Sequence, residues 1–177
     1  LVSSFISSLG AMVASLSQGK NFQGIREEMR GIEERLKTKS FDFLSLAQKD
    51  EQAFQEFMEA LRRAKREGFS GKFLSLKAKE AIRIPLEVIE ELSSLFPAFE
   101  LLLKEGNKNL VSDVGIACIL ASAVIRASTL NVLINLPLVQ EDNLREEILL
   151  KVQRAFQYAL NFDGLAQTAK KCLEGGE

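Results

Sequence analysis

The feature that most constrains the fold of this 177-residue chain is a long stretch without a helix breaker. Neither proline nor glycine occurs from residue 32 to residue 67. Apolar residues recur there at the three- and four-residue spacings of one helical face, including Ile32, Leu36, Phe43, Phe54, Met58 and Leu61. Such a helix would be about 60 Å long. A domain of this size cannot cover it alone, so we expect a long helical hairpin that serves as a dimer interface.

The composition favours an all-α fold. Residues with high helix propensity dominate, and the chain has only three prolines. Hydrophobic residues make up 46% and charged residues 27%, which is the balance of a folded soluble domain rather than a disordered chain. We therefore predict one multihelical bundle over residues 1–177, with a buried central helix.

The central helix is expected at residues 110–136, which are apolar on nearly every side. Asp113, Arg126, Asn131 and Asn135 interrupt this segment. Charged and amide side chains are costly in lipid, so we predict the buried centre of a bundle and not a membrane span. The first 17 residues predict another buried helix, too short for a span and without the basic start of a signal peptide.

The charge and the missing residue types exclude several classes of function. With 23 basic and 24 acidic residues, the chain lacks the basic surface that nucleic acids require. It contains no histidine, so the usual acid–base group and the commonest zinc ligand are absent, and we predict no metal site. Cys118 and Cys172 are far apart in sequence and predict reduced thiols in a cytoplasmic protein.

Residues 105–115, EGNKNLVSDVG, place an unusual number of polar side chains directly before the central helix. We expect Gly106 to end the preceding helix and Ser112 to cap the next one. A turn and a helix cap do not account for the other polar residues, which are Asn107, Asn109 and Asp113. They are therefore candidates for binding a ligand.

Several motifs resemble the formiminotetrahydrofolate cyclodeaminase and methenyltetrahydrofolate cyclohydrolase family. The most specific are Gly106-Asn107-Lys108-Asn109, Ser112-Asp113-Val114-Gly115, Asn131-Val132 and Ile134-Asn135-Leu136. Weaker matches are Gly19-Lys20, Asp50 with Ala53-Phe54, Lys65 and Pro85-Leu86. The resemblance covers almost the whole chain. The family usually has a Pro- and Gly-rich segment before the first helix, and we expect that this segment is missing here.

The resemblance implies a helical fold, often dimeric, and a tetrahydrofolate substrate with or without a polyglutamate tail. It implies no bound cofactor. Two reactions occur in the family: cyclisation of 5-formiminotetrahydrofolate to 5,10-methenyltetrahydrofolate with release of ammonia, and hydrolysis of the methenyl compound to 10-formyltetrahydrofolate. No residue chooses between them. The alternative is a non-catalytic, dimeric folate-binding or interaction protein that keeps the fold.

The resemblance also suggests roles for individual residues. The predicted catalytic residues are Asp113, as base or stabiliser of the methenyl cation, Asp50, as a second carboxylate, and Lys65. The predicted substrate-binding residues are Asn107, Asn109, Asn131, Asn135 and Lys20, the last for the glutamate tail. Carboxylates and amides suit a cationic substrate, and one positioned carboxylate contributes about 10²–10⁴-fold in rate.

Each of these residues also has a purely structural interpretation. Asp113 would be favoured in the first turn of a helix by the helix dipole. Asn107 and Asn109 suit a turn, and Asn131 and Asn135, one helical turn apart, could tie the central helix to a neighbour. Asp50, Lys20 and Lys65 would be exposed surface charges.

Overall fold

The computed structural model describes residues 1–19, 22–67 and 71–175, and within these ranges all regular structure is helical. The elements are α1 (Val2–Ser15), α2 (Arg26–Glu67), α3 (Gly71–Ser94), α4 (Phe96–Glu105), α5 (Val111–Asn135) and α6 (Asp142–Gly175). Short 3-10 turns, η2 (Lys108–Leu110) and η3 (Leu136–Leu138), flank α5. The predicted all-α bundle is confirmed.

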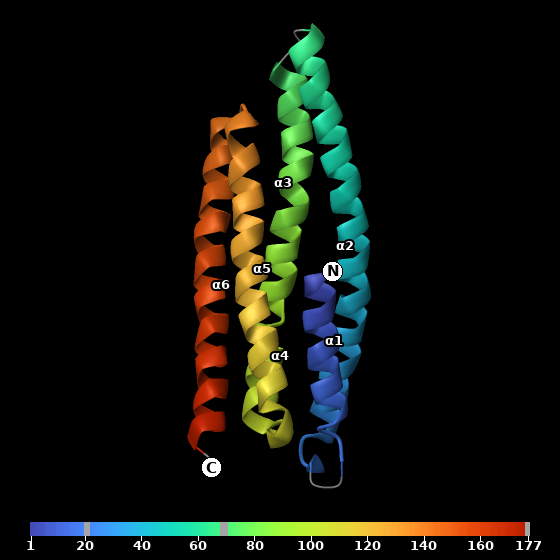
Figure 1. Ribbon diagram of the computed structural model, residues 1–177, viewed down its shortest axis with the longest axis vertical. Helices are drawn as coiled ribbons and strands as arrows, with labels where there is room; N and C mark the ends of the chain where they lie inside the picture. The colour runs from blue at the N-terminus through green and yellow to red at the C-terminus, as the bar shows by residue number, and fades with distance from the viewer. Residues whose placement is uncertain (20–21, 68–70, 176–177) are drawn as a thin grey trace.

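The helices run nearly parallel to the long axis of the molecule (Figure 1). Helix α5 packs most extensively against α6, and also against α3 and α1. Helices α1 and α2 pair on the other side of the bundle, and α3 lies between the two pairs (Figure 1). The central position predicted for residues 110–136 is therefore correct.

The long helix predicted from the missing helix breakers is α2, with 42 residues or about 63 Å. It pairs with α3, and the two extend beyond the other helices at one end (Figure 1). A second hydrophobic cluster stabilises this hairpin where it meets the end of α5 and the start of α6. Its buried members are Phe57, Ala78, Ile82, Val132, Leu136, Val139, Ile148 and Val152. The hairpin is confirmed, and its use in dimerisation stays a prediction.

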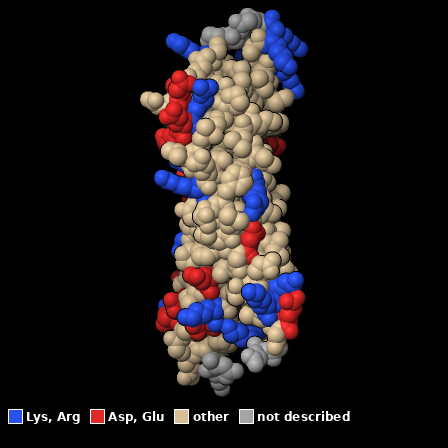
Figure 2. Space-filling view, turned by 90° about the vertical axis from the view of Figure 1, so that its left-hand side faces the viewer, with Lys and Arg blue, Asp and Glu red and all other residues tan. Residues whose placement is uncertain are grey.

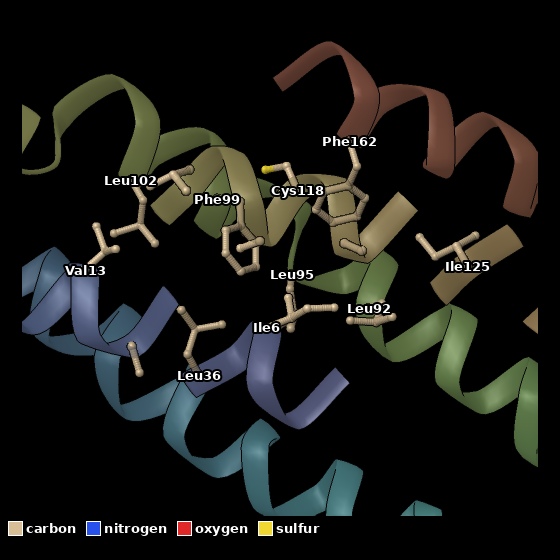
Figure 3. Packing of buried hydrophobic residues seen from close by; sticks show 14 of the residues in the cluster. Ile6, Val13, Leu36, Leu92, Leu95, Phe99, Leu102, Cys118, Ile125 and Phe162 are labelled. Carbon is tan, nitrogen blue, oxygen red and sulfur yellow. The ribbon is translucent and has the colours of Figure 1, made fainter. Parts of the chain in front are cut away.

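The main core lies where all six α-helices, α1 to α6, converge (Figure 3). Phe162 of α6 meets Phe96 and Phe99 edge to face, with ring centroids 5.4 and 6.1 Å apart. Cys118 is fully buried in this core. Burial raises the pKa of its thiol to about 12, so it stays protonated and packs as a small apolar side chain.

Two prolines test the predicted helix boundaries. Pro85 lies inside α3, which continues to Ser94 without ending at the proline. Pro97 lies in the first turn of α4. A backbone N–H at this position would have no hydrogen-bond partner within the helix, so the proline, which lacks one, costs the helix nothing there. The first predicted helix ends at Ser15 and not at residue 17, and α2 begins at Arg26, after a turn.

Gly10 lets α1 approach its neighbours closely. A Cβ atom at this position would lie 2.9 Å from Leu36 Cδ1 and 2.9 Å from Phe99 Cε1. Gly31 is also helical, but a Cβ there would meet nothing within 4 Å. The two glycines therefore form a matched pair for testing the packing of α1.

We predict that Gly10→Ala lowers the free energy of unfolding by about 1–3 kcal/mol, because the core must move to accept a methyl group. Gly31→Ala should raise it by about 0.5–1 kcal/mol, since alanine favours the helix. Urea unfolding monitored by circular dichroism measures both. Equal effects of the two substitutions would contradict close packing at Gly10.

Candidate functional site

A cavity of about 560 Å³ opens between the middle of α2, the middle of α3 and the end of α5. Its polar lining residues are Asp50, Asn131 and Asn135. Its walls are apolar and come from Phe54, Phe57, Met58, Leu61, Ala81, Pro85, Ile134 and Leu138. A volume of this size, with few polar groups in an apolar wall, is typical of small-molecule sites.

A smaller cavity of about 140 Å³ adjoins the first. The two share Asp50, Pro85 and Asn131. The smaller one reaches toward the start of α1, where Leu1 and Ser3 line it. Helix α1 begins at about mid-height of the bundle (Figure 1), and its first residues line the smaller cavity together with Ser128 and Asn131 of α5. The shared residues therefore form the centre of one continuous site.

Asp50 is the only carboxylate that lines either cavity among the described residues. It forms no ion pair or hydrogen bond there, although α2 is rich in such pairs. Asp50 is exposed at the cavity. The apolar side chains around it nevertheless remove part of its hydration, and this partial desolvation raises the pKa of Asp50 above its ordinary value. A carboxylate without a partner in an apolar pocket is available to a cationic ligand.

Asn131 and Asn135 lie one turn apart at the end of α5 and line the same cavity, as their spacing predicts. Asn135 Nδ2 donates to the carbonyl oxygen of Asn131 at 3.2 Å. This bond stays within α5. It therefore orients the Asn135 amide at the cavity wall and does not tie α5 to a neighbouring helix.

The polar segment 105–113 lies at the opposite end of α5 and joins the end of α1 to the turn before α5. The backbone N–H of Asn107 donates to Ser17 Oγ at 2.8 Å, and its Nδ2 donates to the carbonyl oxygen of Leu16 at 3.3 Å. Asn107 Oδ1 also accepts from the backbone N–H of Asn109 at 3.1 Å. Asn107 therefore has a structural role in this chain.

The ends of the helices around this turn only partly follow the prediction. Gly106 ends α4 as expected, and its N–H donates to the carbonyl oxygen of Leu102. The residue before α5 is Leu110, so the prediction of Ser112 as the N-cap is wrong, and Ser112 lies exposed in the first turn. Lys108 Nζ satisfies the end of α4 by donating to the carbonyl oxygens of Leu103 and Lys104.

The structure thus divides the predicted site residues into two groups within one chain. Asp50, Asn131 and Asn135 meet at the cavity, whereas Asp113, half-buried in the first turn of α5, does not line it. Asp113 and Asn131 are 18 positions apart on one helix, or about 27 Å. A single pterin ring cannot touch both groups in one chain.

The remaining predicted residues lie outside the cavity. The side chain of Asn109 is exposed next to Asn107. Lys65 is exposed on α2, one turn beyond the cavity residue Leu61. Lys20 lies outside the described residues. No cluster of three or more possible metal ligands occurs in the described part of the chain.

The sequence does not reveal the role of every phenylalanine on α2. Their periodic spacing predicts core or interface positions, and Phe43 and Phe57 are buried. Phe54 and Phe57 both line the cavity, and Phe54 is 60% exposed. It lies one turn after Asp50, and that four-residue spacing was the signal that the two side chains share a side of α2.

The structure thus defines an all-α bundle with one unpaired carboxylate and two amides in an apolar cavity among the described residues. Residues 1–154 match the family model described as formiminotransferase-cyclodeaminase. The chain therefore belongs to the formiminotransferase-cyclodeaminase family.

Relatives with curated names support this membership. The chain is 27% identical to the formimidoyltransferase-cyclodeaminase of Mus musculus and 24% identical to that of Gallus gallus, over 156 residues each. These matches cover 85% of this chain and 29% of each relative, so the chain spans less than a third of their length.

A solved structure is similar over nearly the whole fold. The crystal structure of formiminotetrahydrofolate cyclodeaminase from Thermotoga maritima superposes with a TM-score of 0.84 at 31% identity. The match covers 98% of this chain and 84% of that one. The arrangement of helices around the cavity is thus shared with a named cyclodeaminase.

The pKa of Asp50 gives a pH-dependent prediction. Because its pKa is raised, the carboxyl group of Asp50 keeps its proton to higher pH in the folded chain than in the unfolded chain. The free energy of unfolding therefore falls as the pH rises from about 3.9, the ordinary pKa of Asp, through the raised pKa. Asp50→Asn removes this loss. The stability of the variant relative to wild type should therefore increase between pH 3.5 and pH 7, as measured by urea unfolding. Asp42→Asn on the same helix is the control, and an equal increase there would contradict the partial desolvation of Asp50.

Proposed function

We propose that this chain catalyses the cyclodeaminase reaction, converting 5-formiminotetrahydrofolate to 5,10-methenyltetrahydrofolate and ammonia. The observation that carries the proposal is the unpaired Asp50 between apolar walls and two amides, in a fold that matches a cyclodeaminase. The family membership supports a folate substrate.

The cavity suits the reacting part of a folate. A pterin is flat and has hydrogen-bonding groups along its edge, so it needs apolar walls and a few polar partners. Phe54, Pro85 and Ile134 supply apolar surface, and Asn131 and Asn135 supply amide groups. The cationic methenyl product would be stabilised by a nearby carboxylate, which Asp50 provides.

One carboxylate is sufficient for the proton transfers. The reacting formimino group is the protonated, amidinium form. N10 attacks its carbon and forms the new C–N bond while the C=N double bond becomes a single bond to the exocyclic amine, and Asp50 accepts the proton that N10 loses. Asp50 then returns this proton to the exocyclic amine, whose C–N bond breaks to release ammonia. No net proton is gained or lost by the enzyme. A carboxylate with a raised pKa is better matched to exchanging protons with amines near neutral pH.

The outer part of the substrate would extend toward the tip of the hairpin. Lys65 and Arg62 follow the cavity residue Leu61 on α2, and both are exposed. Neither forms an ion pair among the described residues. We assign these two cations to binding the glutamate tail of the substrate, whether that tail has one glutamate or several. We also expect the protein to work in the cytoplasm.

Hydrolysis of the methenyl compound is the neighbouring reaction, and it uses the same cation and carboxylate. The two activities separate in one assay: ammonia with a growing methenyl chromophore defines the cyclodeaminase, and decay of added methenyltetrahydrofolate without ammonia defines the hydrolase. Tight folate binding with neither reaction would define a binding protein, which is the non-catalytic alternative.

We predict that Asp50→Asn lowers kcat for ammonia release by about 10²–10⁴-fold, because it removes the group that transfers the proton. Asn135→Ala should mainly raise KM, since this amide is assigned to binding. Both are measured by coupled detection of ammonia and methenyl absorbance in full-length protein.

Asp42→Asn provides the control for Asp50→Asn, because it makes the same change on the same helix. Asp42 is exposed and forms an ion pair with Lys39, whose Nζ lies 3.3 Å from Asp42 Oδ2. It lines neither cavity. Its kcat should equal that of wild type. A normal kcat for Asp50→Asn in a correctly folded variant would overturn the assignment of Asp50.

A further inference from the structure

The smaller of the two adjoining cavities combines a small volume with a polar lining. Its polar side chains come from α1, α2 and α5 and are Ser3, Asp50, Ser128 and Asn131. Its volume of about 140 Å³ is a quarter of that of the larger cavity, which is about 560 Å³. It has room for a few molecules of the size of water or ammonia, each about 30 Å³, but not for a two-ring pterin.

The polar groups of this cavity are not used to hold the chain together. In the described chain, the hydroxyl groups of Ser3 and Ser128 and the side-chain amide of Asn131 form no hydrogen bond with another residue. Ser3 and Ser128 are buried, with 7% and 8% of their surface exposed. Unpaired polar groups in a buried position are costly. A small molecule that both donates and accepts hydrogen bonds therefore fits this cavity.

Another unpaired hydroxyl group lies one helical turn beyond Ser3 on α1. Ser7 is fully buried, and its Oγ has no hydrogen-bond partner in the part of the chain that the structure describes. The four-residue spacing places Ser7 on the same side of α1 as Ser3. This side of α1 therefore carries one more hydroxyl group than the fold itself uses.

Asp50 is the only charged side chain at the smaller cavity among the described residues. Charged side chains gather toward the two ends of the α6 side of the molecule (Figure 2), but no described residue of α6 lines either cavity. A molecule in the smaller cavity therefore meets one carboxyl group and several neutral donors and acceptors. Such surroundings suit a small neutral molecule that exchanges a proton with Asp50.

We propose that the smaller cavity holds the leaving nitrogen of the reaction, first as the exocyclic amine and then as ammonia. This inference rests on the proposed function. A general acid must lie about 2.6–3.2 Å from the atom that receives its proton. Asp50 lines both cavities, so the amine that it protonates lies where they meet. The pterin then occupies the larger cavity, and the amine projects into the smaller one.

The release of ammonia into this cavity needs no further reactant. In the tetrahedral intermediate, Asp50 gives its proton to the exocyclic amine. The C–N bond to that nitrogen breaks, and its electron pair leaves with the nitrogen as neutral ammonia. The electron pair of a ring nitrogen forms the C=N bond of the methenyl cation. The hydroxyl groups of Ser3 and Ser128 can then donate to the lone pair of ammonia, which keeps this lone pair from attacking the cation again.

Filling the smaller cavity tests this role. Ser128→Val occupies part of its space and should lower kcat for ammonia release about tenfold, with little change in KM, because the pterin lies elsewhere. Ser128→Ala keeps the space and removes the hydroxyl group, so its kcat should fall only about threefold. Coupled detection of ammonia and methenyl absorbance measures both. A Ser128→Val variant no slower than Ser128→Ala would show that the space is not used and would overturn the proposal.

Ser93→Val is the matched control. Ser93 is also 8% exposed, it lines neither cavity, and its Oγ donates to the carbonyl oxygen of Ile89 on the same helix. Its kcat should equal that of wild type. Equal losses in Ser93→Val and Ser128→Val would trace the effect to general packing and overturn the proposal. If urea unfolding shows that Ser128→Val does not fold, Ser3→Val in the first turn of α1 fills the same cavity and takes its place.

Ligand binding separates this inference from the proposed function. 5-Formyltetrahydrofolate carries an oxygen at the position of the formimino nitrogen, whereas tetrahydrofolate lacks the whole group. By titration calorimetry, Ser128→Val should raise Kd for 5-formyltetrahydrofolate about tenfold and leave Kd for tetrahydrofolate unchanged. Unchanged Kd values for both ligands would overturn the role of the smaller cavity and leave the folate site standing. No binding of either ligand to wild type would instead refute the proposed function.

Water is the competing occupant, because hydrolysis of the methenyl compound needs a water molecule at the same carbon atom. Added methenyltetrahydrofolate separates the two cases. We expect Ser128→Val to slow ammonia release and to leave the decay of the methenyl compound at the rate of wild type. The reverse result, slower methenyl decay with normal ammonia release, would assign the smaller cavity to water and overturn the proposal.

Discussion

The burial of α5 is the constraint on which the rest of this structure depends. Apart from Asp113, Arg126, Asn131 and Asn135, this helix is apolar on nearly every side, so it requires neighbouring helices on several sides. Helices α1, α3 and α6 cover three of its sides and fix the positions of the other elements. The end of α5 then faces the middle of α2, and the cavity forms there because α1 begins below that level (Figure 1).

Much of the fold could be predicted from the sequence, because helix periodicity and helix breakers are local properties. The length of α2 follows from the absence of proline and glycine, and the central place of α5 from its apolar composition. Local signals failed at helix ends. Ser112 has the chemistry of a cap, but the 3-10 turn at Lys108–Leu110 moves the start of α5 to Val111. Pro85 is tolerated inside α3, a tolerance the sequence does not predict.

The candidate site was predictable only in part. The motifs identified Asp50, Asn131 and Asn135, which the fold brings to one cavity although Asp50 is remote from the others in sequence. The same motifs also included Asn107 and Asp113, about 27 Å away along the bundle. A linear motif does not say whether its parts meet in one chain or across two. The apolar half of the cavity was missed, because Phe54 and Ile134 belong to the same periodic patterns as core residues.

The cavity centred on Asp50 is the proposed folate site. A crystal structure with 5-formyltetrahydrofolate, a stable relative of the proposed substrate, tests this assignment most directly. We expect the pterin to lie against Phe54 and Pro85, with Asp50 and Asn131 within hydrogen-bonding distance of the ligand. Ligand density that touches none of these residues, for example at Asn107 and Asp113 of a chain whose cavity is empty, would contradict it.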